Sequence, residues 1–176
     1  MTAKEKTIIG RTTKASFPRE RVRGVPAKID TGADSSSIWA SELHIDDDFT
    51  LHYVLFAKGS PYYTGKKHST KLYKVRLVKS SNGTQQIRYS VKLTIVLGKR
   101  KVRGSFTLAD RSQNTYPVLV GNKLLYRKFL VDVSRGAIRT DEQKVKTNAL
   151  NREMTLDPKA FFEKYHLENQ RGDIGL

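Results

Sequence analysis

Two stretches of alternating apolar and polar residues flank an Asn-Gly dipeptide and do most to limit the fold of this 176-residue chain. They cover residues 72–78 and 87–97, with Asn82-Gly83 between them. Alternation is the period of a half-buried β-strand, and Asn-Gly is the strongest short signal for a tight hairpin turn. The pattern predicts an antiparallel hairpin whose second arm places on one face Ile87, Tyr89, Val91, Leu93, Ile95 and Leu97.

Most of the remaining chain up to about residue 139 also has strand character, so the fold class is predicted to be all-β. The further strands are expected at residues 7–10, 22–29, 102–108, 116–121 and 128–133. A short helix is expected at residues 122–126. Residues 43–70 have weak periodicity and are predicted to form a long excursion from the sheet.

The C-terminal part is predicted to be a separate extension, which divides the chain into a domain of residues 1–139 and an appendage of residues 140–176. Residues 140–153 are polar and are predicted to be a linker. Asp157 and Pro158 are typical of an N-cap and a first helical position. Phe161, Phe162 and Tyr165 share a face of that helix, which we expect to pack on its own barrel or on a partner's.

Charge limits the choice of partners. Lys and Arg total 33 against 17 Asp and Glu, a formal net charge of +16. Such a field attracts polyanions, so RNA, the ribosome, an anionic membrane and an acidic protein segment are all candidates, and simple solubility is the alternative explanation. The chain has no cysteine, which excludes disulfides and thiol chemistry. No signal peptide or membrane span is evident, and a cytoplasmic location is expected.

The segment with the clearest chemical meaning is Asp30-Thr31-Gly32-Ala33, which follows a predicted strand. A strand that ends at Asp30 delivers its carboxylate to a fixed position, and Gly32 allows the backbone to turn sharply. On its own the motif is also typical of a tight turn that uses Asp and Gly. About ninety residues later, Val118-Leu119-Val120-Gly121 forms an apolar run that ends at Gly.

In this order of strand, Asp-Thr-Gly-Ala, hairpin and apolar-apolar-Gly segment, the chain resembles retropepsin-like aspartic proteases over residues 7–138. It is most similar to a bacterial group that carries the name ATP-dependent zinc protease, some members of which trim glutamate tails from a ribosomal protein. That likeness includes Lys79-Ser80-Ser81-Asn82-Gly83, Ala109-Asp110-Arg111-Ser112 and residues 128–135. The resemblance implies a closed acid-protease barrel with a short helix after the apolar-apolar-Gly strand.

The resemblance also implies roles for individual residues. Asp30 would be catalytic, within an active-site loop formed by Thr31, Gly32 and Ala33. Substrate would be bound by Asp34 and by the hairpin tip, Ser80, Ser81, Asn82 and Gly83. The supporting strand would be formed by Val118, Leu119, Val120 and Gly121.

The sequence departs from the family near that loop. The similar bacterial proteins usually have a basic residue in place of Asp34 and an arginine in place of Asn122. Viral retropepsins pair an aspartate with an arginine at these two positions, whereas this chain has the aspartate without that arginine, although Lys123 is adjacent. Asp34 is equally consistent with substrate binding and with a structural turn. Asp110 and Asp132 are weaker candidates for a carboxylate partner of Asp30 within one chain.

Neither half of the zinc and ATP name is supported by the residues, and we expect no metal and no cofactor. His44, His52, His68 and His166 are scattered, without a His-Glu-x-x-His motif, and no phosphate-binding Gly-rich motif occurs. The acidic run of residues 46–48 is typical of a solvated loop, with cation binding as the alternative.

One Asp-Thr-Gly per chain means that a catalytic carboxylate pair requires two chains. We therefore expect a homodimeric aspartic endopeptidase in which two Asp30 carboxylates activate a water, and we expect its substrates to be acidic peptides, including glutamate-rich ones. The alternative is a non-catalytic basic β-barrel that binds RNA or the ribosome. Tyr62, Tyr63 and Tyr73 would favour the alternative if their rings were exposed for base stacking.

Overall fold

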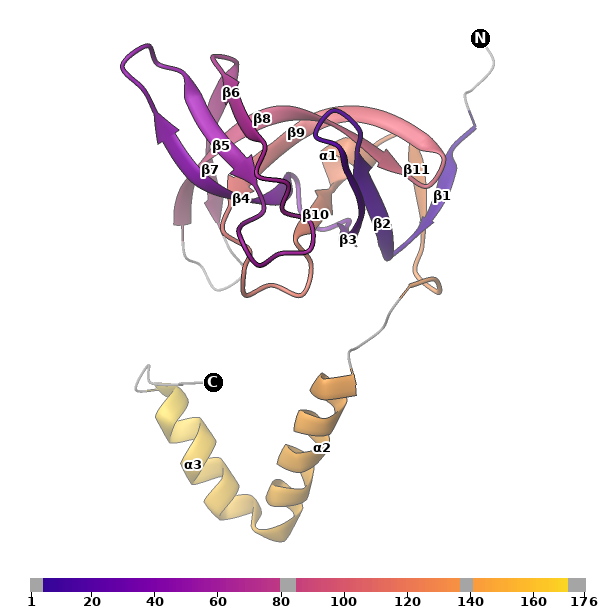
Figure 1. Ribbon diagram of the computed structural model, residues 1–176. Helices are drawn as coiled ribbons and strands as arrows, with labels where there is room; N and C mark the ends of the chain where they lie inside the picture. The colour runs from indigo at the N-terminus through magenta and orange to yellow at the C-terminus, as the bar shows by residue number, and fades with distance from the viewer. Residues whose placement is uncertain (1–4, 80–84, 137–140, 171–176) are drawn as a thin grey trace. The chain divides into compact units, whose positions relative to one another are not determined.

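The computed structural model describes residues 5–79, 85–136 and 141–170. The chain divides into two compact units, Met1–Gly136 and Ala137–Leu176. The first consists of strands and one helical turn, and the second of two helices (Figure 1).

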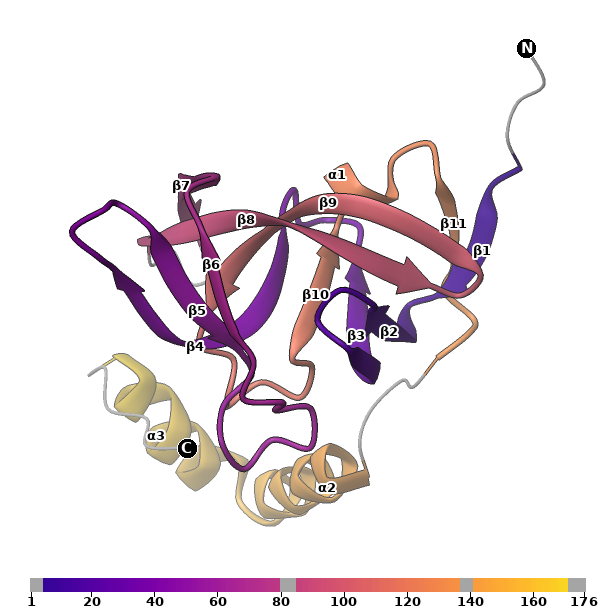
Figure 2. The ribbon, with the colours of Figure 1, turned by 45° about the horizontal axis from the view of Figure 1, so that its top comes forward.

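Six strands of the first unit close into a barrel, as the all-β prediction required. Their order around the barrel is β10-β3-β2-β8-β9-β4, and pairing of β10 with β4 closes the ring. The strands are β2 (Thr12–Phe17), β3 (Val22–Asp30), β4 (Ser36–Ile45), β8 (Gln85–Leu97), β9 (Arg100–Ala109) and β10 (Val118–Gly121). Figure 2 shows β8 and β9 running side by side over β10, β3 and β2.

Alternating apolar residues of these strands fill the barrel. Phe17 and Phe106 meet edge to face with their ring centroids 5.9 Å apart. The same core contains Ile95 and Val120, which are completely buried. Burial of each such side chain is worth about 1.5–3 kcal/mol. The period-2 pattern in the sequence is thus the inward face of the barrel.

The predicted hairpin is present as β7 (Tyr73–Lys79) paired with β8, in a register that joins Tyr73 to Val91 and Lys79 to Gln85. The buried face of β8 begins only at Val91, because Ile87 remains 74% exposed. The hairpin therefore extends beyond the barrel core. Its tip, with Asn82-Gly83, lies outside the described residues.

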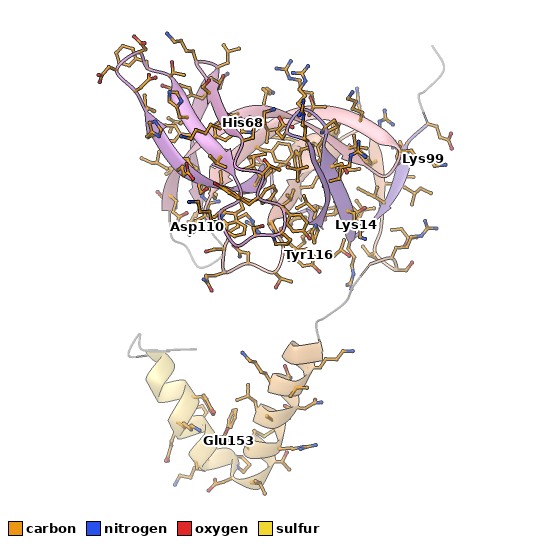
Figure 3. All side chains as sticks on the ribbon, viewed as in Figure 1. Lys14, His68, Lys99, Asp110, Tyr116 and Glu153 are labelled. Carbon is orange, nitrogen blue, oxygen red and sulfur yellow. The ribbon has the colours of Figure 1, made fainter. Side chains whose placement is uncertain are left out.

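The remaining strands lie at the edges of the barrel. Residues 43–70, predicted as an excursion, include β5 (Leu51–Leu55) and β6 (Lys67–Thr70), which extend the sheet from β4. His68 of β6, labelled in Figure 3, stacks on Tyr53 at 5.2 Å between ring centroids. β1 (Thr7–Gly10) and β11 (Phe129–Asp132) form a separate parallel pair. α1 (Asn122–Leu125) directly follows β10.

The second unit corrects one expectation. Residues 141–156, most of which were predicted to be linker, form helix α2 (Asp141–Leu156). The segment lacks a regular apolar stripe, so periodicity gave no helix signal, yet Ala, Leu, Met, Lys, Glu and Gln are all good helix formers. No described helix is long and apolar enough to cross a membrane.

Helix α3 (Pro158–Gln170) begins at Pro158, directly after Asp157, as the sequence predicted from these two residues. The Asp157 Oδ1 accepts a hydrogen bond from the Ala160 N–H at 2.9 Å. Glu153 of α2, labelled in Figure 3, joins the two helices through the Lys164 ammonium at 2.6 Å and the Tyr165 hydroxyl at 2.9 Å. The packing of Phe161, Phe162 and Tyr165 on a barrel stays a prediction.

One carboxyl in the first unit, that of Glu20, is buried with too few hydrogen bonds to replace those that water would make. Glu20 is 6% exposed, and its Oε2 has no hydrogen-bond partner among the described residues. Burial raises the pKa of Glu20, and a backbone hydrogen bond with the charges of Lys66 and Arg19 offsets only part of the effect. The fold thus prefers the protonated form. The contribution of Glu20 to stability is complete below its ordinary pKa and is lost as pH rises through the raised pKa.

We therefore expect Glu20→Gln to raise the melting temperature at pH 7.5, by about 2–4 °C for each 1 kcal/mol gained. The gain should disappear near pH 4, where the wild-type carboxyl is protonated. Calorimetry at both pH values checks this, with Glu42→Gln, an exposed glutamate, as control. An equal gain at both pH values would contradict the assignment to ionisation.

Candidate active site

Asp30 is the last residue of β3 and is only partly buried. Its Oδ1 accepts hydrogen bonds from the backbone N–H groups of Gly32 and Ala33, both at 3.1 Å. These two bonds fix the orientation of the carboxylate. From the described residues, Oδ2 accepts no hydrogen bond, so this oxygen can take a water or a substrate group. Thr31 and Gly32 are exposed beside it.

The loop after Asp30 is held by β10, which lies between β3 and β4. Parallel pairing with β3 places Gly121 opposite Asp30, and antiparallel pairing joins Val118 to Ile38 of β4. The Gly121 N–H donates to the Ser36 Oγ at 3.0 Å. Residues 118–121 thus form a strand that is paired on both sides, and their supporting role for a catalytic loop stays a prediction.

The first turn of α1 continues this support. The Asn122 N–H donates to the Ala33 carbonyl at 2.7 Å, and the Lys123 N–H donates to the Asp34 carbonyl at 3.2 Å. Residues on both sides of Asp30 are therefore tied to strands and to α1 by backbone groups. Such a loop needs no large rearrangement to present its carboxylate, which favours catalysis.

Asp34 is braced by a residue that the motif comparison did not assign. The Lys123 Nζ lies 2.8 Å from the Asp34 Oδ2. Hydrogen bonding to Lys123, together with its charge, lowers the pKa of Asp34. The pair takes the place of the arginine that is absent at position 122, although both side chains are exposed and the pair adds little stability. The adjacent cation in the sequence was the available signal.

The two other candidate carboxylates, Asp110 and Asp132, accept hydrogen bonds from residues that follow them closely in the chain. Asp110, labelled in Figure 3, follows β9, and the Ser112 N–H donates to its Oδ1 at 2.8 Å. Asp132 ends β11 and accepts hydrogen bonds from Ser134. These bonds lower the pKa of each carboxyl. Neither is bonded to the Asp30 loop, and the implied substrate-binding tip, residues 80–83, lies outside the described residues.

The acidic run and the histidines form local contacts. The Asp46 Oδ1 accepts the N–H groups of Asp48 and Thr50, while its Oδ2 lies 2.7 Å from the His52 Nε2. The rings of His44 and His52 stack at 4.8 Å between centroids. Among the side chains that the structure describes, no three of His, Asp or Glu are grouped to hold a metal ion.

The chain matches the model of one protein family, described as RimB-like, retropepsin-like aspartic endopeptidase RimB, over residues 8–142. That description contains neither zinc nor ATP.

Curated relatives carry a different name. A protein of Shewanella pealeana, named as an alpha-L-glutamate ligase, is 29% identical over 141 residues, which are 73% of this chain and 29% of the relative. One of Desulfotalea psychrophila with the same name is 23% identical over 130 residues, 72% of this chain and 28% of the relative. The chain thus spans less than a third of the length of these relatives.

Among solved structures, a protein of unknown function from Legionella pneumophila shares the fold. It has a TM-score of 0.54 and 24% identity, and the match covers 74% of this chain and 96% of that protein. With the family match over residues 8–142, the closed barrel and the braced Asp30 loop, the chain belongs to the RimB-like family of retropepsin-like aspartic endopeptidases.

Proposed function

We propose that the protein is an aspartic endopeptidase whose active site contains two Asp30 carboxylates, one from each chain of a homodimer. The observation that carries the proposal is the placement of Asp30. It stands at a strand end, with Oδ1 held by two backbone N–H groups and its loop braced by Gly121 on β10. The match to an endopeptidase family supports the same reaction class.

The proposed reaction is general acid–base hydrolysis. Two carboxylates that lie close together cannot both be ionised, so they share one proton between them. This behaviour is established for aspartic-protease dyads. The ionised member takes a proton from a water as its oxygen attacks the scissile carbonyl carbon, and the protonated member donates to the carbonyl oxygen. Collapse of the tetrahedral intermediate breaks the C–N bond. The leaving nitrogen takes the proton that the first carboxylate received from the water, and the hydroxyl of the intermediate returns its proton to the second carboxylate.

Pairing of two chains has support from the β1–β11 sheet. Ile8 and Leu130 lie opposite each other in its register and are 52% and 50% exposed. Two large apolar side chains that share one exposed face are typical of an interface core. We propose that this face forms part of the dimer interface.

The substrate we propose is an acidic, glutamate-rich peptide segment. The net charge of +16 attracts such a segment. In the curated relatives, a region similar to this chain belongs to a longer protein named for glutamate ligation. A peptidase region within such a protein is consistent with cleavage of the glutamate-containing product.

The RNA-binding alternative has less support from the aromatic residues. Tyr62 packs against Phe56 at 5.7 Å between ring centroids, and Tyr73 packs against Tyr89 at 5.9 Å. Tyr63 is half-buried. These rings are engaged within the protein and offer less free surface for stacking bases.

Interface variants test the dimer and its activity together. We expect Ile8→Asp combined with Leu130→Asp to shift the protein to a monomer in sedimentation velocity, because four buried carboxylates would face one another across the interface. Cleavage of a glutamate-rich peptide, followed by mass spectrometry, should fall at least about a hundredfold.

Phe49→Asp serves as control, because Phe49 is a 77% exposed aromatic side chain away from β1 and β11. It should remain dimeric and active. Full activity in a monomeric double variant, or no cleavage of any peptide by the dimeric wild type, would overturn the proposed function.

A further inference from the structure

Two cationic cavities open along β9, and the smaller one reaches the segment that follows the Asp30 loop. The smaller, about 280 Å³, reaches Ser35 and Ser36 of that loop region and also Arg76, Lys92 and Arg103. The larger, about 610 Å³, lies at the other end of the β8–β9 hairpin, near β1, and is lined mainly by Lys99, Arg100 and Lys101. Figure 2 shows β8 and β9 running from the β7 side of the barrel toward β1 and β11.

The two cavities adjoin each other, because Arg103 and Lys128 line both. We call the two neighbouring cavities together the cationic groove. Among the described residues, the one acidic residue in its lining is Glu5, in the larger cavity.

Three cations of the smaller cavity lack a counter-charge. Lys123 is paired with Asp34, and the Lys128 Nζ is directed at the carbonyls of Leu124 and Tyr126. The side chains of Arg76, Lys92 and Arg103, in contrast, have no hydrogen-bond or ion-pair partner among the described residues. Like charges gathered in one cavity repel one another unless an anion lies between them. The cavity is therefore suited to an anionic ligand.

Strand register places two of these cations on one face of the sheet. Lys92 of β8 pairs with Ser105 of β9, and Thr94 pairs with Arg103. Arg103 is two residues from Ser105, so it shares the face of Lys92 and lies diagonally across from it. Diagonal neighbours are about 7–8 Å apart, a distance that two long cationic side chains can close around a single carboxylate.

The position of the smaller cavity relates it to the reaction centre. The Ser36 Oγ accepts the N–H of Gly121, and Gly121 pairs with Asp30, so β10 is the one strand between them. Neighbouring strands are about 4.8 Å apart, which puts Ser36 about 10 Å from Asp30. An extended peptide advances about 3.3 Å per residue. A residue in this cavity would lie within about three positions of the bond that is cleaved.

The groove lining favours carboxylate over nucleic acid. No described aromatic side chain lines either cavity, so this part of the structure offers no platform in the groove on which bases could stack. Its neutral polar residues are mainly serines and threonines, whose hydroxyls donate to small oxyanions.

We propose that the cationic groove is the specificity site of the peptidase and that it takes a run of acidic side chains on one side of the scissile bond. Arg103, where the two cavities meet, is the principal specificity-determining residue. A short acidic run fills the smaller cavity, and a longer run continues into the larger one toward Lys101. This inference rests on the proposed function, because it assigns the substrate of that site.

The test compares peptides with two or six consecutive glutamates beside the cleavage site, each with a glutamine counterpart. Arg103→Gln and Lys92→Gln should lower the glutamate-to-glutamine ratio of kcat/KM at least about tenfold, the usual effect of losing one charge-assisted hydrogen bond. The loss in Lys101→Gln should grow as the acidic run lengthens from two to six. Lys14→Gln, an exposed cation on β2 labelled in Figure 3, is the matched control and should keep the wild-type ratio.

Binding separates this inference from the proposed function. Fluorescence anisotropy measures the affinity of labelled hexaglutamate for the full chain carrying Asp30→Asn, in which the peptide binds to the groove but is not cleaved. Loss of hexaglutamate binding in Arg103→Gln would support the groove even if no peptide were hydrolysed.

Two outcomes would overturn the proposal that the cationic groove is the specificity site. The first is an unchanged glutamate preference in both Arg103→Gln and Lys92→Gln. The second is a variant that loses affinity for a 12-nucleotide RNA while its affinity for hexaglutamate stays at the wild-type level.

Discussion

Asp30→Asn is expected to lower kcat for peptide hydrolysis by at least about 10³-fold while the protein stays folded and dimeric. The Asn carbonyl oxygen can still accept the N–H groups of Gly32 and Ala33, which are 3.1 Å from the Asp30 Oδ1. The loop geometry should therefore survive. The amide cannot take a proton from water, so the chemical step alone is lost. Steady-state kinetics with a glutamate-rich peptide measure kcat, and circular dichroism shows whether the variant is folded.

Asp110→Asn is the matched control, because Asp110 is one of the two aspartates considered as a partner of Asp30 within one chain. Its carboxylate serves Ser112 at 2.8 Å, and the variant should retain activity. Mixing wild type with excess Asp30→Asn should also reduce activity, because each mixed dimer has a single carboxylate. Wild-type rates from Asp30→Asn, or a proportional decrease without mixed-dimer inhibition, would contradict a shared dyad.

The fold could be predicted where neighbours in sequence determine the structure. Alternation identified the β7–β8 hairpin and the inward face of β8 from Val91 to Leu97, because a strand with one buried face imposes a period of two. Asp157 predicted the start of α3, because an N-cap contact spans only three residues. Asp30 was placed at a strand end for the same local reason.

Other features depend on contacts that a linear pattern does not encode. The brace of Asp34 comes from Lys123, 89 residues later, and only its place beside position 122, where the similar proteins have an arginine, gave a signal for this contact. Lys92 lies in a strand whose alternation shows only that it is not on the apolar face. Its place in a cavity with Arg76 and Arg103 follows from the closure of the barrel. Helix α2 was missed because its helix-forming residues lack an apolar stripe.

Gly121→Ala is expected to have the largest effect on stability. A Cβ at Gly121 would lie 2.6 Å from the backbone carbon and oxygen of Ser35 and 2.7 Å from the carbonyl oxygen of Ala33. These are backbone atoms, so no side-chain rotation relieves the overlap. β10 would have to move away from the Asp30 loop, which would weaken the hydrogen bonds that Gly121 and Asn122 donate to Ser36 and Ala33.

We expect a loss of about 3 kcal/mol or more, at the upper end for overpacking, and a melting temperature lower by about 6–12 °C. Gly32→Ala is the matched control for stability, because a Cβ there meets only the Asp30 Oδ1 at 3.5 Å, an ordinary contact. Thermal unfolding of the two variants separates steric overlap from a general effect of removing glycine. If Gly121→Ala melted no lower than Gly32→Ala, close packing of β10 against the loop would not be what holds Asp30 in place.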